Sequence, residues 1–327
     1  MPETTVTTPR QYPLSMGADT FGIAILGTGI MGRKMLAALQ QHPRFRVVMA
    51  WDPDANALQA ALAQTTNVRS AASADSLVSD AAVDVVYIAS PPAWHAGAVS
   101  SVLQAGKACF CEKPLTHDIA EAETLRAAVL RSGLPFAVNF PFARGTASSR
   151  MREIVLSGDL GPIESATVRL RFARWPRDWQ AGASAWLAGP TEGGFTREVL
   201  SHFAFQSLRL FGPAAVADVE LQRAPGQAET ALRARWIHPG VQVLVDAAVA
   251  GEIADDNRFE VLGERGRVAL TAWSRLEHQG HTSERVDNTA NTLDGLAALL
   301  EGRAEHGLAT VDEAVSVVRC VESMLRP

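Results

Sequence analysis

The chain has 327 residues, and at roughly 150 residues per domain this length predicts two domains. Hydrophobic residues make up 47% and charged residues 20% of the chain, proportions that exclude disordered, collagen-like and coiled-coil proteins. The formal net charge of −5 provides no positive field for a nucleic acid or an acidic membrane surface, so neither is expected as a partner.

The N-terminal segment and the cysteines indicate the compartment. Residues 1–20 lack a charged start followed by an apolar block, so we expect a short flexible arm rather than a secretory signal. No apolar run is long enough for a membrane span. Cys109, Cys111 and Cys320 are odd in number, which favours buried reduced thiols, and a Cys-x-Cys pair without nearby ligands is a poor zinc signal. We expect a cytoplasmic protein without a metal site.

Short apolar runs alternate with helical segments in the first part of the chain, residues 21–141. We expect strands at 21–26, 46–51, 83–90, 107–111 and 135–140, and helices at 31–41, 54–64, 95–105 and 118–132. The last helix opens on Asp118-x-x-Glu121, the pattern of a capping box, and ends at Gly133. Continuous hydrophobicity in the strands is typical of a parallel sheet covered on both faces, so this region predicts a doubly wound α/β domain, a Rossmann domain.

The pattern changes in residues 142–327, which we expect to form a second domain. A helix at 147–157 precedes a run of alternating strands, several of them joined by glycine-containing turns at 225–226, 239–240 and 263–266. Two helices, at about 289–301 and 310–325, end the chain. The second domain is therefore expected to be α+β with a mostly antiparallel sheet; that this sheet is open and serves substrate binding and oligomerisation is implied only by the family resemblance given below.

A glycine-rich loop follows the first predicted strand and opens the first predicted helix. It reads Gly27-Thr28-Gly29-Ile30-Met31-Gly32, the G-x-G-x-x-G pattern of dinucleotide-binding loops. The first glycine permits the tight turn, the second admits the pyrophosphate close to the backbone, and the third allows close helix–strand packing. Asp52 lies 20 residues after Gly32, where a carboxylate accepts hydrogen bonds from the adenosine ribose and repels a 2′-phosphate. The sequence thus predicts NAD as cofactor, with NADP possible as a second one.

Two further motifs follow strands of the same domain. Ser90-Pro91-Pro92-Ala93-Trp94-His95 ends the third long strand, and Glu112-Lys113-Pro114 ends the next. Here the chain resembles the glucose–fructose oxidoreductase, inositol dehydrogenase and rhizopine catabolism (Gfo/Idh/MocA) oxidoreductases. AGKACFCEKPL is similar to the family's most specific signature, and the terminal helix ATVDEAVSVVRCVESML also fits. The resemblance implies a cofactor site that includes Ser90, Pro91, Pro92, His95, Glu112 and Lys113.

Lys113 becomes the expected active-site lysine on this resemblance. An ammonium beside the reacting carbon can polarise a carbonyl or stabilise an alkoxide while hydride moves. The resemblance also implies a cis bond between Lys113 and Pro114.

A second group of candidate catalytic residues follows a double glycine at 193–194. In a helix, Glu198 and His202 are four residues apart and share a face, so the carboxylate could orient the imidazole, which could then shuttle a proton. The family pattern has Asp-x-Gly-x-His with another Asp three residues later. Here Glu198 replaces the first Asp, Leu200 replaces the Gly and Phe205 stands at the second Asp position. The candidate catalytic residues are therefore Lys113, His202 and Glu198, with Phe205 making the substrate pocket more apolar.

An aromatic segment just before the double glycine is a candidate roof for the substrate. Trp175 and Trp179 could stack on a sugar or aromatic ring, and the arginines Arg174 and Arg177 could hold a carboxylate, although this segment could equally pack against the sheet or a subunit. Asn139 and Arg144 match polar positions of the family at the exit of the first domain. His278-x-x-His281 lies in a polar stretch without a third ligand, so we expect a solvated loop there.

These patterns predict an NAD(P)-dependent oxidoreductase that acts on a small hydroxyl or carbonyl substrate such as a sugar, polyol or related alcohol. Two alternatives remain open: an enzyme for imine or dihydrodiol-type substrates, and an NAD-binding regulator without chemistry. The resemblance implies a homodimer or homotetramer formed through the sheet of the second domain.

Overall fold

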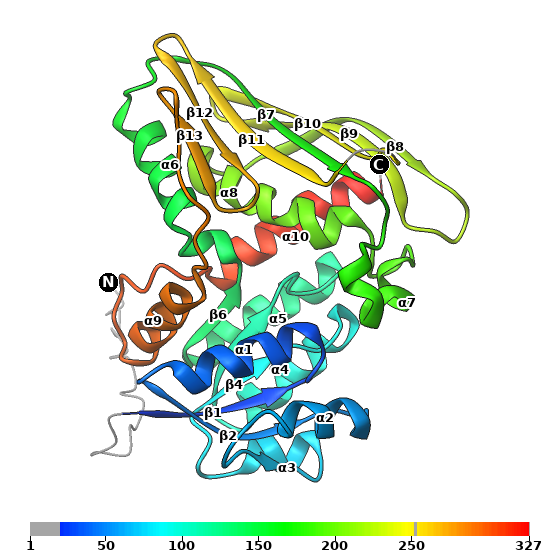
Figure 1. The fold of residues 1–327 in the computed structure, drawn as a ribbon, viewed down its shortest axis with the longest axis vertical. Helices are drawn as coiled ribbons and strands as arrows, with labels where there is room; N and C mark the ends of the chain where they lie inside the picture. Colours follow the sequence, from blue (N-terminus) through cyan, green and yellow to red (C-terminus); the bar gives the residue numbers. More distant parts are fainter. Residues whose placement is uncertain (1–19, 252–253, 327) are drawn as a thin grey trace, which may run out of the picture.

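The computed structural model describes residues 20–251 and 254–326. The expected N-terminal arm lies almost entirely outside the described residues. Two sheets organise the chain, one above the other in Figure 1, and helices fill the space between them.

The first sheet has six strands in the order β3-β2-β1-β4-β5-β6, all paired in parallel. They are β1 (Phe21–Leu26), β2 (Phe45–Trp51), β3 (Arg69–Ser70), β4 (Val85–Ile88), β5 (Ala108–Glu112) and β6 (Phe136–Asn139). Every residue of β1, β4 and β5 is buried, as expected for strands covered on both faces. The predicted doubly wound domain is confirmed.

The helices of this part are α1 (Ile30–Gln41), α2 (Ala55–Leu62), α3 (Ala74–Ser79), the 3-10 turn η1 (Pro92–Trp94), α4 (His95–Gln104) and α5 (Ile119–Ser132). The four expected helices lie within a few residues of their expected positions, and α3 and η1 are additional elements. Asp118 caps α5 by accepting from the Glu121 N–H, and Gly133 ends it in the left-handed conformation. The second bond of the expected capping box, from the Asp118 N–H to the Glu121 carboxylate, is wrong. The Glu121 carboxylate accepts instead from the Thr116 hydroxyl.

The second sheet has eight strands in the order β14-β13-β12-β11-β7-β10-β9-β8. They are β7 (Ile163–Phe172), β8 (Ala215–Arg223), β9 (Glu229–His238), β10 (Val241–Val249), β11 (Asp256–Gly263), β12 (Gly266–Thr271), β13 (Arg275–His278) and β14 (His281–Thr282). Only β7 and β10 pair in parallel within this sheet, so the expected open, mostly antiparallel arrangement is confirmed. The expected loop at His278 and His281 is wrong, because these residues pair across the β13–β14 hairpin.

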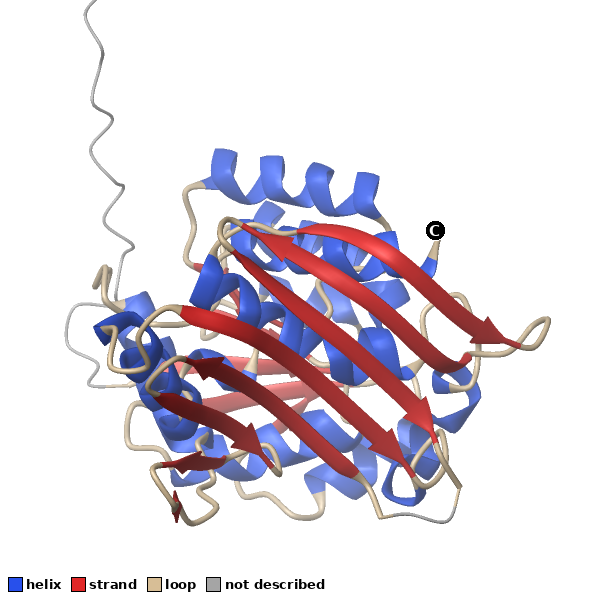
Figure 2. Cartoon of the chain, turned by 90° about the horizontal axis from the view of Figure 1, so that it is seen from above, coloured by secondary structure: helices blue, strands red, loops and turns tan. Residues whose placement is uncertain are grey.

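Helices cover one face of the second sheet, the face toward the first domain. They include α6 (Thr146–Ser157), α8 (Ser201–Phe211) and α10 (Val311–Leu325), which lie between the two sheets in Figure 1. Two short turns, η2 (Pro141–Ala143) and η3 (Asp178–Ala183), and the short helix α7 (Ser184–Leu187) complete this layer. In Figure 2 the opposite face of the sheet is turned toward the viewer, with these helices behind it.

The C-terminal segment returns to the first domain. α9 (Thr289–Leu300) packs its Leu293 and Leu296 into the same apolar cluster as Met35 and Leu39 of α1. Val138 of β6 also forms a β-bridge with Ala309. The C-terminal segment therefore packs against α1 and β6 of the first domain.

All three cysteines are buried and free, as expected. Within residues 20–251 and 254–326, no helix has the length and apolar character needed to cross a bilayer. No group of three or more His, Cys, Asp or Glu side chains in these ranges is arranged to hold a metal ion.

Candidate active site

The glycine-rich loop joins β1 to α1, and its three glycines meet different surroundings. A Cβ on Gly27 would lie 2.7 Å from Ala89 backbone atoms, and a Cβ on Gly32 would lie 2.0 Å from the Gly27 carbonyl. Gly27 also has φ +98°, a left-handed conformation that favours glycine. A Cβ on Gly29 would meet nothing within 4 Å, and no side chain caps α1 at this residue. Backbone N–H groups at the start of α1 are thus left available to an anion.

Asp52 directly follows β2, and its carboxylate binds the glycine-rich loop. Its Oδ2 accepts from the Thr28 backbone N–H at 2.6 Å and from the Thr28 hydroxyl at 3.1 Å, while Oδ1 accepts from the Asp54 N–H at 2.9 Å. An ionised carboxylate has about four acceptor positions, so Oδ1 keeps one for a further donor. Ile30 and Met31 begin α1 beside this carboxylate-braced loop.

His95 lies behind the cofactor-side loops rather than among groups open to a ligand. Its Nδ1 is 2.8 Å from the Pro114 carbonyl oxygen and its Nε2 is 2.8 Å from the Ser90 carbonyl oxygen. The ring is buried, and desolvation lowers its pKa below the ordinary histidine value. Both ring nitrogens of His95 are thus engaged by the protein, and the contact of His95 with the cofactor stays a prediction. The His95 ring fastens the Ser90-Pro91-Pro92 loop to the segment after Lys113.

The side chain of Glu112 is also turned inward. It accepts hydrogen bonds from the Tyr87 hydroxyl and, at 2.7 Å, from the Asn139 amide. Burial raises the pKa of Glu112 above its ordinary value, and these donors oppose that rise. The Glu112 carboxylate thus orients Asn139, and the contact of Glu112 with the cofactor stays a prediction.

Lys113 and Glu198 meet across the two halves of the chain. The Lys113 Nζ donates to Glu198 Oε2 at 2.6 Å and to the Glu198 backbone carbonyl at 2.8 Å. The lysine side chain is only 8% exposed and the glutamate side chain 20%. The Lys113–Pro114 peptide bond is cis, as the resemblance implies. A partly desolvated, oriented ammonium thus stands at the carboxyl end of β5.

The expected contact between Glu198 and His202 is wrong. Residues Thr196–Leu200 form a π-helical turn (η4) before α8, and such a turn changes which residues share a face. The turn is held by Arg197, which makes a two-pronged buried ion pair with Glu322 of α10 at 2.6 and 2.8 Å. Glu198 consequently points to Lys113, and its side chain, which is one methylene longer than that of the family's Asp, reaches the lysine ammonium.

His202 occupies an aromatic enclosure. Phe140, Phe142 and Trp273 surround its ring at centroid distances of 6.0, 5.8 and 5.3 Å, and its buried Nδ1 has no hydrogen-bond partner among the described residues. Desolvation, with the charges of Lys113 and Arg177, lowers the pKa of His202 well below its ordinary value. The enclosure therefore favours the neutral imidazole over its protonated form.

Two residues expected at the substrate contact other parts of the protein. Phe205 is fully buried and stacks on Phe140 at 4.6 Å, because it faces the core side of α8. Arg144 donates from Nε to the Asn291 carbonyl at 3.0 Å and so fastens α9. Neither residue lines the cavity described below, and their contact with a substrate stays a prediction.

The aromatic segment divides between packing and exposure. Trp175 is half-buried against Phe172 and Phe195, and its Nε1 donates to the Leu187 carbonyl at 3.0 Å. Trp179 is 55% exposed and lies at 4.8 Å from the Arg177 guanidinium. Only the second tryptophan offers a free face.

Sequence reasoning missed three residues around this group. Gln180 is buried and donates from Nε2 to Glu198 Oε1 at 3.4 Å. Tyr87 anchors Glu112, and Trp273 packs on His202. No local motif marks them, although a tyrosine within the apolar run 83–90 is a polar group that must find a partner when buried.

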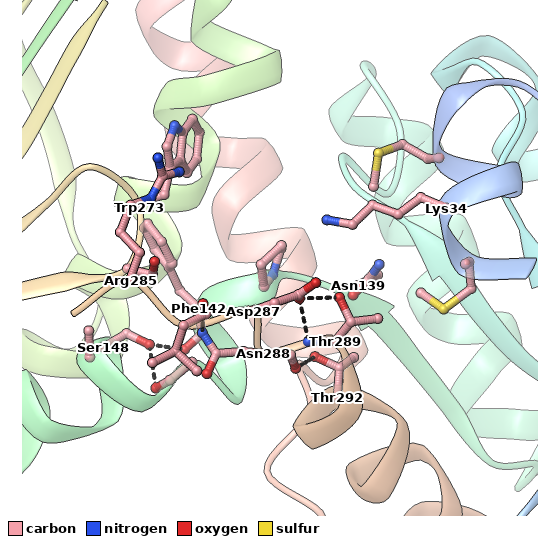
Figure 3. A pocket seen from close by; sticks show the side chains of 17 residues that line it. Lys34, Asn139, Phe142, Ser148, Trp273, Arg285, Asp287, Asn288, Thr289 and Thr292 are labelled. Carbon is pink, nitrogen blue, oxygen red and sulfur yellow. Dashed lines mark hydrogen bonds between the residues drawn. The ribbon is translucent and has the colours of Figure 1, made fainter. Parts of the chain in front are cut away.

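A cavity of about 490 Å³ opens beside the aromatic enclosure of His202, between α1, η2, α6 and the segment before α9 (Figure 3). Figure 3 shows Lys34 reaching into it from α1, opposite Trp273 and Arg285. Met31 and Asn139 are the candidate residues that line it, while Trp273 both lines it and packs edge-on against His202. The cavity thus connects the start of α1 with the enclosure of His202.

Comparison with known families gives two matches along the chain. Residues 21–140 match the model of an oxidoreductase family with an NAD-binding Rossmann fold, and residues 148–269 match the model of the GFO/IDH/MocA C-terminal domain.

Individual relatives extend these matches. Inositol 2-dehydrogenase of Rhizobium meliloti is 26% identical over 92% of this chain and 97% of its own length. The dTDP-3,4-didehydro-2,6-dideoxy-α-D-glucose 3-reductase of Streptomyces violaceoruber is 27% identical over 81% of each chain. The crystal structure of the WlbA dehydrogenase from Bordetella pertussis, in complex with NADH and UDP-GlcNAcA, has a similar fold, with a TM-score of 0.82 at 20% identity over 94% of this chain and 96% of its own.

Proposed function

The chain belongs to the Gfo/Idh/MocA family of NAD-binding oxidoreductases, and we propose that it transfers hydride between NAD and a hydroxyl group of a sugar, polyol or related alcohol. The observation that carries this proposal is the ion pair of Lys113 and Glu198 beside the neutral, enclosed His202. Relatives that act on inositol and on a deoxysugar support the substrate class.

The first domain fits the cofactor at the start of α1. The open space at Gly29 and the uncapped N–H groups suit the pyrophosphate, and the remaining acceptor position of Asp52 suits a ribose hydroxyl. A 2′-phosphate would lie beside the same carboxylate, which favours NAD over NADP. When bound, the nicotinamide supplies the hydride acceptor or donor.

The side chains of this protein handle charge and proton. His202, as a neutral imidazole, takes the proton of the substrate hydroxyl. The Lys113 ammonium stabilises the negative charge that grows on that oxygen, and Glu198 holds the ammonium in place. Lys113 and His202 act on the substrate, whereas Glu198 is a positioning residue.

Phe205 no longer supports an enzyme for imine or dihydrodiol-type substrates, because its ring belongs to the core. Glu198 replaces an Asp of the family pattern, which raised the possibility of a regulator without chemistry. Its carboxylate is bonded to Lys113, which argues against that alternative. Of these three functions, we therefore propose that of an alcohol oxidoreductase.

The test begins with the cofactor. Purified protein is titrated with NADH and with NADPH, and energy transfer from tryptophan to the reduced nicotinamide is followed. We expect tighter binding of NADH and, in a panel of polyols and sugars, reduction of NAD⁺. Tighter binding of NADPH would contradict the role of Asp52, and tight NADH binding without turnover of any alcohol, aldehyde or imine would favour a regulator.

A further inference from the structure

Arg177 is an arginine of the aromatic segment that is linked to the proposed active site through Gln180 and Glu198. Its guanidinium carbon lies 4.8, 5.5 and 5.9 Å from the ring centroids of Trp179, Trp175 and Phe172. Such faces hold a guanidinium plane by cation–π attraction while leaving its edge free. Burial lowers the pKa of Arg177 from its ordinary value, yet arginine keeps its proton in proteins.

Gln180 fixes how this side chain is turned. The Gln180 Oε1 accepts from the Arg177 Nε at 3.0 Å and from the Arg177 backbone N–H at 3.1 Å. The Gln180 amide donates in turn to Glu198, whose other carboxylate oxygen is bonded to Lys113. One buried glutamine therefore couples the orientation of Arg177 to the ion pair.

The two terminal Nη nitrogens of Arg177 are available to bind a ligand. Among the described residues, neither Nη atom has a hydrogen bond or an ion pair within 4.0 Å, whereas neighbouring Arg174 is paired with Asp178 at 2.8 Å. Among the residues that the structure describes, the Lys113 charge is balanced by Glu198 at 2.6 Å, and no carboxylate is directly bonded to Arg177, whose charge is attracted by Glu198 and Asp255 only at longer range. The exposed Asp255 is bonded to the Ala173 N–H instead.

We propose that Arg177 binds a carboxylate of the substrate through its two Nη groups, so that the substrate is an acidic sugar or polyol such as an aldonate or a uronate. The inference rests on the proposed function and narrows its substrate class. A guanidinium fork matches a carboxylate with two parallel hydrogen bonds. The single positive charge of Arg177 suits a monoanion better than a phosphate dianion, and the exposed face of Trp179 suits a sugar ring.

The experiment compares substrates in which a carboxylate or a phosphate replaces one neutral group of the same sugar or polyol. Initial rates of NAD⁺ reduction are measured for the full chain with D-gluconate and D-glucuronate, with their neutral counterparts D-sorbitol and D-glucose, and with glucose 6-phosphate. We expect kcat/KM to be highest for a carboxylate. Arg177→Gln should lower kcat/KM for that carboxylate about 10- to 100-fold, mainly through KM, and should lower kcat/KM for the neutral counterpart clearly less. Arg174→Gln, in the same segment, is the matched control and should change neither.

The other outcomes overturn the inference in distinguishable ways. Higher kcat/KM for the neutral sugars, or an equal loss for neutral and acidic substrates in Arg177→Gln, would remove the carboxylate role while leaving the oxidoreductase intact. Preference for the sugar phosphate would assign the arginine to a phosphate. If NADH binds and nothing turns over, calorimetry of the NADH-loaded protein with D-gluconate decides: absence of binding contradicts the proposal, and binding lost in Arg177→Gln supports it. Failure to bind NADH would instead remove the proposed function.

Discussion

Lys113 and Glu198 come from different halves of the chain, and their contact is the smallest unit on which the proposed chemistry depends. The ammonium makes two short bonds to one residue, the Glu198 carboxylate at 2.6 Å and its backbone carbonyl at 2.8 Å. A lysine held in this way cannot swing into solvent, so its charge is already in place when a substrate oxygen becomes negative. Preorganised charge of this kind is usually a large contribution to rate.

We therefore expect Lys113→Met to lower kcat by about 100-fold or more while NADH still binds. Glu198→Gln should have a smaller effect, because the backbone carbonyl of residue 198 still accepts from Lys113. The measurement is steady-state kinetics with the best alcohol of the panel, and NADH titration of each variant is the control for folding. Unchanged turnover in Lys113→Met would refute the role of this lysine.

His202 makes the stability of the fold depend on pH. Because burial lowers its pKa in the folded state, the unfolded chain binds more protons below the ordinary value of 6.5. Stability then rises with pH in the interval between the lowered pKa and 6.5, and falls as pH decreases through it. Above that interval both states are neutral and this residue has no effect on the pH dependence.

Urea unfolding of the parent chain and of His202→Phe at several pH values tests this sign. Phenylalanine fits an aromatic enclosure and cannot titrate, so the variant should lose up to about 1.4 kcal/mol per pH unit of slope below pH 6.5 and none above it. His95 and His238, whose pKa values are also lowered, are present in both chains and cancel in the comparison. Equal slopes for both chains would contradict a buried neutral His202.

At the scale of elements, the π-helical turn Thr196–Leu200 decides where Glu198 points, and a buried ion pair holds that turn. Arg197 is 4% and Glu322 1% exposed, and Arg197 also donates to the carbonyls of Pro190 and Gly193. Removal of one partner leaves the other charge buried, at a cost of about 3–5 kcal/mol. We expect Arg197→Met to lose stability of this size in urea unfolding.

The double variant Arg197→Met with Glu322→Leu should recover a large part of that loss, because no buried charge remains. Its kcat should stay low, since the turn that places Glu198 has lost its anchor. The exposed pair of Arg150 and Glu153 is the control, and Arg150→Met should cost less than about 1 kcal/mol. A double variant with full activity would show that the turn needs no such anchor.

Most elements could be predicted because their patterns are local. The buried strands of the first sheet and the capped helix α5 follow from apolar runs and from Asp118 and Gly133. The two-residue strand β3 and the six-residue helix α3 are too short for any periodicity, and both were missed. For short elements of this kind, pairing with a neighbouring strand or helix decides the structure.

The site was predictable as a set of residues but not as a set of contacts. The dinucleotide loop, Lys113 and His202 lie at the carboxyl ends of strands or on α8, as their motifs indicate. The partner of Glu198 depends on a π-helical turn, and that turn depends on Glu322, 125 residues away from Arg197 in the chain. No spacing rule within a motif contains such long-range information.

At the scale of the whole molecule, the eight-stranded sheet presents one face without helices in the described ranges (Figure 2), and we propose that the oligomer forms there. Charged side chains on this face are paired across strands, for example Arg169 with Asp256 at 2.8 Å and Arg171 with Asp246. Leu244 in β10 is 50% exposed among them, next to Thr167 and Arg235 on the adjoining strands. Because these charges already have partners, a second copy can cover the apolar residue between them without burying an isolated charge.

Sedimentation of the purified chain should therefore give a dimer or tetramer, and Leu244→Asp should shift it toward the monomer. An added carboxylate at this position would be buried without a partner in the assembled protein, which is unfavourable. Leu156→Asp is the matched control, because Leu156 is 58% exposed on α6, on the side of the sheet that faces the first domain. Assembly through this face leaves the cavity between the two sheets accessible, so the Leu244→Asp monomer should keep its affinity for NADH. A parent chain that sediments as a monomer would contradict the proposed assembly. An oligomer that only Leu156→Asp dissociates would place the interface elsewhere.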